Sequence, residues 1–208
     1  MIKIIAHRGM WFRPDEKNTV AAFERALESG FGIETDFRDF NGELVVSHDP
    51  ANAASMKADV FFDLCNRYPN ANPHAINIKS DGLQKLLTPH FDSWKKERYF
   101  VFDMSVPDSL GYLNLGINTY VRVSEYESYQ DFGGQASGIW LDGFHEDWYG
   151  IGHIRQYLKM NKPIAIVSSE LHGRDHRGLW AMIKSLHTPI ARLMLCTDFP
   201  IEAKNYFS

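Results

Sequence analysis

Two acidic side chains that could hold a metal ion lie two residues apart in an apolar run. Glu34 and Asp36 belong to the predicted strand 32–37. Because strand side chains alternate between faces, both carboxylates point to the same side. Two carboxylates on a buried face are costly unless a positive charge neutralises them. The expected partner is a hard divalent cation, Mg2+ or Ca2+, because such ions prefer oxygen ligands.

A second pair with the same spacing ends the predicted strand 75–79. Asn77 carries an amide oxygen that can bind the same ion, and Lys79 carries an ammonium group that can face an anionic substrate. Both side chains point to one face of the strand because they are two residues apart. The two strands together supply oxygen ligands and a positive charge.

Two histidines and an arginine complete this set of polar residues at strand ends. His7 and Arg8 follow the first apolar run, and His48 follows the short second strand of a hairpin predicted from an Asn-Gly turn. One imidazole can accept a proton from the nucleophile while the other donates a proton to the leaving oxygen. Arg8 and Lys79 can stabilise negative charge that grows on phosphate oxygens. These residue types together suit phosphoryl transfer.

Eight short apolar runs alternate with helix-like stretches, and these elements must position the polar residues. The runs cover residues 2–6, 32–37, 75–79, 99–104, 118–123, 138–142, 163–167 and 190–196, and the helices cover residues 18–29, 82–97, 107–115, 150–160 and 177–186. The alternation predicts an α/β protein with a single (β/α)8 TIM barrel over residues 1–208, which builds its sites at the carboxyl ends of the strands. A doubly wound open sheet is the alternative, but it normally has a Gly-rich nucleotide loop after its first strand, where this chain has His-Arg-Gly.

Composition and charge exclude several classes of protein. The 208 residues are 44% hydrophobic, which is enough to bury a core and excludes a disordered chain. A formal net charge of −4 disfavours a nucleic-acid partner. No apolar stretch approaches the roughly 18 residues of a membrane span, and the first residues turn polar too soon for a signal peptide. We therefore expect a cytoplasmic protein that acts on a small molecule. Five histidines are expected to be structural or surface residues: His74, His90, His153, His176 and His187.

Four segments resemble one known family, the glycerophosphodiester phosphodiesterases, which belong with the phosphatidylinositol-specific phospholipase C-like phosphodiesterases. The matching segments are residues 7–9 (His-Arg-Gly), 33–39 (Ile-Glu-Thr-Asp-Phe-Arg-Asp), 44–49 (Leu-Val-Val-Ser-His-Asp) and 197–200 (Thr-Asp-Phe-Pro). The resemblance is dense over the first fifty residues and looser beyond them. It implies a (β/α)8 barrel, one divalent cation, and cleavage of a small-molecule phosphodiester, one side of which is often glycerol.

The resemblance also implies roles for individual residues. His7 and His48 become the acid–base pair, Glu34 and Asp36 become metal ligands, and Arg8 and Lys79 become phosphate contacts.

The chain departs from the family pattern at two of its motifs. The family's Pro-Glu-Asn-Thr is spread over residues 14–19, which leaves the role of Glu16 open. Asn77 stands where the family has an acidic residue, which lowers the negative charge of the metal site. Asp103 at the end of the fourth run, or Asp142 at the end of the sixth, can compensate as a further ligand.

The substrate pocket is the least constrained part of the sequence. The stretch from His48 to Ile76 is too short for the insertion that helps to bind glycerol in many family members. Arg122 and Glu170 lie near strand ends and are predicted substrate contacts.

Three functions fit these residues. The leading one is a metal-dependent phosphodiesterase, in which a substrate is hydrolysed by His/His acid–base catalysis. The others are a barrel that binds a phosphoryl ligand without turnover, motivated by Asn77, and a lyase of the same superfamily that releases a cyclic phosphate.

Overall fold

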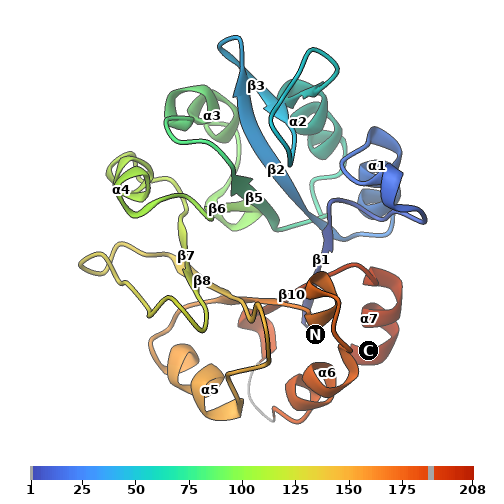
Figure 1. The fold of residues 1–208 in the computed structure, drawn as a ribbon, viewed down its shortest axis with the longest axis vertical. Coiled ribbons are helices and arrows are strands. Elements are labelled where there is room, and N and C mark those ends of the chain that lie inside the picture. Colours follow the sequence, from blue (N-terminus) through green and yellow to red (C-terminus); the bar gives the residue numbers. More distant parts are fainter. Residues whose placement is uncertain (1, 187–189) are drawn as a thin grey trace. The chain divides into compact units, whose positions relative to one another are not determined.

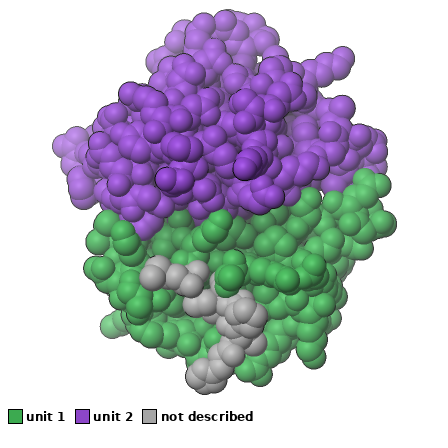
Figure 2. Space-filling model, turned by 180° about the vertical axis from the view of Figure 1, so that it is seen from behind, with its two compact units in different colours: residues 1–4, 120–208 green, residues 5–119 purple. Residues whose placement is uncertain are grey.

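The structure is a computed structural model that describes residues 2–186 and 190–208, so His187 lies outside the described residues. Strands alternate with helices along the chain (Figure 1), which confirms the predicted α/β class. The chain divides into two compact units, which Figure 2 distinguishes by colour. Unit 2 comprises residues Ile5–Thr119, and unit 1 comprises Met1–Ile4 and Tyr120–Ser208. Closure of all strands into a single barrel stays a prediction.

Unit 2 is built on a sheet whose main strands run parallel. Its strands are β1 (Lys3–His7, from Ile5 on), β2 (Gly32–Phe40), β3 (Glu43–Val46), β4 (Met56–Lys57), β5 (His74–Ile78) and β6 (Tyr99–Phe102). The parallel order is β1-β2-β5-β6, and β3 and β4 extend the β2 edge as antiparallel strands. β2 is longer than predicted because its pairing with β3 continues from Phe37 to Phe40. The register sets His7 opposite Glu34.

Four α-helices pack in unit 2. They are α1 (Val20–Glu28), α2 (Ala58–Arg67), α3 (Gln84–Phe91) and α4 (Val106–Asn114). The predicted helix 18–29 begins later because the Thr19 side chain caps it, accepting a hydrogen bond from the Ala22 N–H at 3.3 Å. The predicted helix 82–97 is shorter, since the chain turns after Phe91 and buries Trp94. α2 was not predicted.

The hydrophobic core of unit 2 lies between the sheet and these helices. Phe37, on the face of β2 opposite the two acidic residues, contacts Phe61 and Phe62 of α2 with ring centroids 5.6 Å apart in each case. His74 is fully buried beneath these rings and accepts a hydrogen bond from the Ile33 N–H at 3.3 Å. Burial lowers the pKa of His74 to about 3, so this histidine is a neutral structural residue.

Unit 1 has a sheet of four parallel strands in the order β7-β8-β9-β10. The elements are β7 (Tyr120–Val123), β8 (Gly138–Leu141), α5 (Ile151–Lys159), β9 (Ile164–Val167), α6 (Arg177–Lys184), β10 (Leu193–Thr197) and α7 (Pro200–Phe207). β8, β9 and β10 are buried along their whole length, which explains their continuous hydrophobic sequences. Within the described ranges, no helix is long and apolar enough to cross a membrane.

Candidate active site

The His-Arg-Gly segment makes a sharp turn at the end of β1. Arg8 and Gly9 both have positive φ angles, 56° and 88°. A Cβ atom at Gly9 would lie 2.8 Å from the backbone carbonyl carbon of Ala22 in α1. Glycine is therefore required at this position both by its backbone conformation and by the close approach of the helix. The turn fixes His7 and Arg8 at the carboxyl end of the strand.

Asp36 is a fully buried carboxylate surrounded by donors from three elements. Arg8 Nε lies 3.2 Å from Asp36 Oδ2, and Lys79 Nζ lies 3.6 Å from Asp36 Oδ1. The Asn18 amide donates a hydrogen bond to Asp36 Oδ2 at 2.9 Å. Two cations and an amide compensate the burial of this one carboxylate.

Glu34 is also buried, with 2% of its surface exposed, but it has weaker partners. His7 Nε2 lies 3.9 Å from Glu34 Oε2, and the Asn77 amide donates to Glu34 Oε1 at 3.3 Å. Burial, and secondarily the negative charge of Asp36, raise the pKa of Glu34 to about 7. Without a bound cation, this carboxyl group therefore holds a proton over part of the neutral range.

The raised pKa of Glu34 predicts how stability depends on pH in metal-free buffer. Between its ordinary value of 4.5 and about 7, the folded protein binds this proton and the unfolded chain does not. The Glu34 contribution to the free energy of unfolding therefore falls as pH rises through this window. Glu34→Gln should remove this contribution, so the variant should gain stability relative to the native protein between pH 5 and pH 8. Urea unfolding with a chelator present measures the difference.

Glu24→Gln is the matched control, because Glu24 is an α1 carboxylate whose side chain is 42% exposed. It should show the native change in unfolding free energy between the two pH values. An identical pH dependence for Glu34→Gln and the native protein would contradict the description of Glu34.

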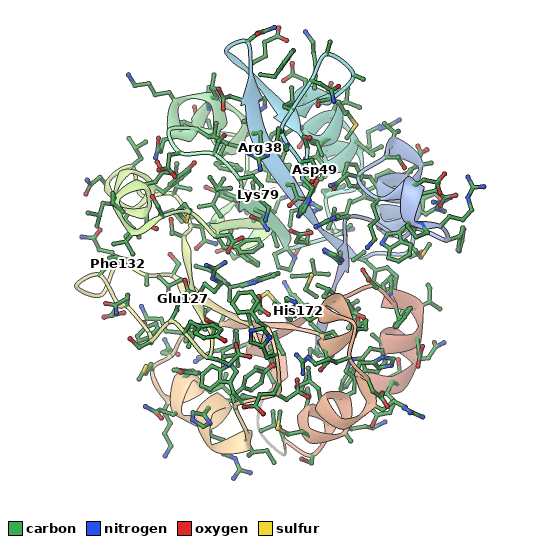
Figure 3. All side chains as sticks on the ribbon, in the orientation of Figure 1. Arg38, Asp49, Lys79, Glu127, Phe132 and His172 are labelled. Carbon is green, nitrogen blue, oxygen red and sulfur yellow. The ribbon has the colours of Figure 1, made fainter. Side chains whose placement is uncertain are left out.

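Lys79 links the β2 carboxylates to β6. It follows β5, and its N–H donates to the Phe37 carbonyl at 3.0 Å, which extends the strand pairing by one residue. Its ammonium group (labelled in Figure 3) lies 3.3 Å from Asp103 Oδ2 as well as close to Asp36. Asp103 has a positive φ of 76° just after β6. The structure thus places Asp103 as a counter-charge of Lys79.

Three oxygen atoms in this cluster fit a hard cation. Glu34 Oε2, Asp36 Oδ1 and Asn77 Oδ1 are buried and accept no hydrogen bond from any residue that the structure describes. Buried polar oxygens normally accept hydrogen bonds, so three such atoms on paired strands leave acceptor positions that a cation could fill. Over residues 2–186 and 190–208, no three His, Cys, Asp or Glu side chains form a metal-binding group. The third ligand would therefore be the Asn77 amide, and a set of two carboxylates and one amide oxygen suits Mg2+ or Ca2+.

His48 is held at the end of the β2–β3 hairpin by two neighbours. Its carbonyl accepts hydrogen bonds from Arg38 Nε and Nη2 at 3.2 and 3.1 Å, and its ring Nδ1 lies 3.0 Å from Asp49 Oδ1 (Arg38 and Asp49 are labelled in Figure 3). When Nδ1 carries a proton and donates it to Asp49, Nε2 is the ring nitrogen left for proton transfer. The side chain is 44% exposed, which leaves it accessible.

Asn18 is the site residue that the sequence analysis did not identify. It has a positive φ of 58°, and its side chain connects two residues of β2: it donates to Asp36 and accepts from the Thr35 hydroxyl at 2.8 Å. The Asn-Thr pair in the family-like segment 14–19 was the available signal. Glu16 has a different role, because it accepts hydrogen bonds from Arg25 and from a backbone N–H and so fixes the loop before α1.

The two predicted substrate contacts in unit 1 have partners within that unit. Arg122 Nε and Nη2 form a bidentate ion pair with Glu127 at 2.6 and 2.9 Å. Glu170 accepts hydrogen bonds from the Ser168 and Thr197 hydroxyls and from the backbone N–H after Thr197, which ties together the ends of β9 and β10. Both side chains therefore stabilise loops of unit 1.

Asp142, the alternative ligand, is bound inside unit 1 as well. Its Oδ1 lies 2.7 Å from His172 Nε2 and accepts the Gly143 N–H at 2.8 Å.

Comparisons with known proteins identify the fold. No protein-family model and no curated protein matches the sequence. The chain is similar to a solved glycerophosphodiester phosphodiesterase from Parabacteroides distasonis, at 16% identity and a TM-score of 0.73 over 99% of this chain and 96% of that one. A phosphodiesterase from Oleispira antarctica, solved with the product sn-glycerol-3-phosphate, is 13% identical with a TM-score of 0.72, over 98% of this chain and 96% of that one. A glycerophosphodiester phosphodiesterase from Agrobacterium tumefaciens is 19% identical with a TM-score of 0.71, over 100% of this chain and 99% of that one. The resemblance seen in the sequence is confirmed at the level of the fold.

Proposed function

We propose that the protein is a metal-dependent phosphodiesterase that hydrolyses a glycerophosphodiester or a related small-molecule phosphodiester. The observation that carries this proposal is the cluster in unit 2. There, two buried carboxylates with unsatisfied oxygens lie beside a histidine, an arginine and a lysine on paired strand ends. The fold shared with glycerophosphodiester phosphodiesterases supports it. The proposal includes closure of the strands into the (β/α)8 barrel that the resemblance implies.

The ligand set for the cation would be Glu34, Asp36 and the Asn77 amide. A divalent ion held there supplies positive charge to phosphate oxygens and increases the acidity of a hydroxyl or water bound to it. Arg8 and Lys79 are already fixed next to Asp36 and bring two further positive charges to the place where a phosphate would bind. Preorganised cations of this kind stabilise charge that develops in phosphoryl transfer.

His7 and His48 would carry the protons. His7 lies next to Glu34, whose carboxylate can stabilise the imidazolium that forms when His7 accepts a proton from the nucleophile. In its imidazolium form, His48 would hold its Nδ1 proton toward Asp49 and would donate its Nε2 proton to the departing alkoxide. We therefore assign His48 as the acid and His7 as the base.

An assay with bis(4-nitrophenyl) phosphate tests the proposal. Nitrophenolate release should require a divalent cation, and parallel reactions with Mg2+, Ca2+, Mn2+ and a chelator identify it. Absence of release with every cation would contradict the proposed activity.

Asn18→Ala should reduce the activity without unfolding the protein. The change removes the amide that donates to Asp36 Oδ2 at 2.9 Å, so this carboxylate is less well oriented toward the cation. Loss of such an outer contact typically costs about 10- to 100-fold in metal affinity or activity. The effect should appear as a higher metal concentration for half-maximal rate, measured by titrating Mg2+ into the assay.

Asn41→Ala is a matched control, since Asn41 also has a positive φ, 51°, but lies in the hairpin turn before β3. Asn41→Ala controls for the loss of an asparagine at a positive φ, and only Asn18→Ala should need more metal. An equal metal requirement in the two variants would show that Asn18 only shapes the backbone.

Asn77→Asp should strengthen cation binding. A third carboxylate adds attraction for the ion, but without the ion it repels Glu34, to which the Asn77 amide now donates at 3.3 Å. We expect a lower melting temperature than the native protein in chelator and a larger upward shift on adding Mg2+. Differential scanning fluorimetry measures both, and an unchanged shift would place the ion elsewhere.

A further inference from the structure

A groove of about 620 Å³ adjoins the proposed site in unit 2. One wall is formed by residues 17–20, at the connection between β1 and α1, and the other by residues 46–56, between β3 and β4. Arg8 and His48 line the same groove. A phosphodiester whose phosphate contacts Arg8 and whose leaving oxygen is protonated by His48 would therefore have its leaving alcohol in this groove.

The walls of the groove expose polar and aliphatic surface in about equal amounts. Its polar side chains include an ammonium group (Lys17), a carboxylate (Asp49), an amide (Asn52) and a hydroxyl (Ser55). The described lining contains no phenylalanine, tyrosine, tryptophan, leucine or isoleucine, and its apolar part consists of Val20, Val46, Pro50, Ala54 and Met56. Filling it with a hydrocarbon chain would bury these polar groups without partners, which is unfavourable.

The wall formed by residues 46–56 contains a hydrogen-bonded turn at residues 52–55. Asn52 Oδ1 accepts the Ala54 N–H at 2.9 Å, and Ser55 Oγ accepts the Asn52 N–H at 3.0 Å. These bonds use the acceptor oxygens and leave the amide hydrogens of Asn52 and the hydroxyl hydrogen of Ser55 as donors. The donors of Asn52, Ser55 and Lys17 and the acceptor oxygens of Asp49 match the hydroxyl groups of a ligand, since a hydroxyl both donates and accepts hydrogen bonds.

We propose that this groove binds one alcohol of the phosphodiester and selects a polyhydroxylated alcohol larger than glycerol. The inference rests on the proposed function, and it adds the class of substrate. The volume lies within the range of about 300–1,000 Å³ that is usual for small-molecule sites.

Two tryptophan substitutions test the position of the alcohol. Ala54 lines the groove, whereas its neighbour Ala53 does not, and both are exposed. Ala54→Trp should lower kcat/KM for glycerophosphoinositol by about tenfold or more, since it fills the groove, and should leave glycerophosphomethanol unaffected, because its methyl alcohol is too small to extend along the groove. Ala53→Trp should leave both substrates unaffected. An equal loss on both substrates in Ala54→Trp, or none on either, would overturn the groove assignment.

A leucine substitution tests the class of the alcohol. Ser55→Leu removes a hydroxyl donor and adds apolar surface, so kcat/KM for glycerophosphoinositol should fall about tenfold while glycerophosphomethanol is cleaved as before. A gain by Ser55→Leu on lysophosphatidylinositol would show that an acyl chain occupies the groove and would overturn the assignment. A native protein inactive on bis(4-nitrophenyl) phosphate would instead contradict the proposed function itself.

Discussion

Replacing His7 or His48 by alanine is expected to lower kcat by about 10²- to 10⁴-fold, the usual contribution of a positioned proton donor or acceptor. Each variant loses one of the two proton transfers, while the carboxylate cluster on β2 stays in place. The double variant should lose far less than the product of the single losses, because residues that act as a unit are not additive. Steady-state kinetics on an alkyl diester measure these effects.

The leaving group separates the roles of the two histidines. Nitrophenolate needs little protonation, so a nitrophenyl diester should rescue the His48→Ala variant and not the His7→Ala variant. His90→Ala is a control for lost stability, since the His90 ring stacks on Phe62 with centroids 4.1 Å apart in the core of unit 2. It should melt earlier and keep its kcat. Small, equal losses in both site variants on both kinds of diester would show that the histidines only maintain the fold.

Asp36→Ala is expected to abolish the stabilisation of the protein by divalent cations. The residue is fully buried, and its removal eliminates one of the three unsatisfied oxygens and leaves Arg8 and Lys79 facing the remaining ligands. A cation that binds only the folded state raises stability in proportion to the logarithm of its concentration. The native protein should therefore show a rising melting temperature with Mg2+ or Ca2+, and the variant should show none.

Asp39→Ala provides the comparison on the same strand. Asp39 is exposed on β2, and its carboxylate accepts a hydrogen bond from Ser80 at 2.9 Å. Its removal should leave the metal response intact. A native-like response in Asp36→Ala, measured by isothermal titration calorimetry with either cation, would contradict the assignment of the ligands.

The sequence predicted the elements of the site because their signals are local. The period of two in β2 correctly placed Glu34 and Asp36 on one buried face, and the Asn-Gly turn correctly predicted the hairpin, where both residues have positive φ angles of 51° and 80°. α2 carries a local signal that the sequence analysis did not use, since Ala58, Phe61, Phe62 and Cys65 recur at i, i+3, i+4 and i+7 and form its buried face. α7 was also not predicted, although it begins with Pro200, a residue favoured in the first turn of a helix.

Loop contacts set the remaining features, and the spacing of the residues does not reveal them. Asn18 reaches Asp36 only because the loop before α1 bends through a positive φ at Asn18 itself. Arg122 has suitable chemistry for a phosphate, but Glu127 reaches back and occupies its guanidinium. The partner of a charged side chain thus depends on loop geometry, which neither composition nor periodicity encodes.

The central claim is tested most directly by phosphorus NMR of a glycerophosphodiester incubated with the native protein. With Mg2+, Ca2+ or Mn2+ present, the diester signal should decay and a phosphate monoester signal should grow, and the chelator should stop both changes. His48→Ala run in parallel should leave the diester almost unchanged. A diester signal that persists with every cation would contradict a catalytic role for the cluster, and a cyclic phosphate as the final product would contradict hydrolysis and identify a lyase.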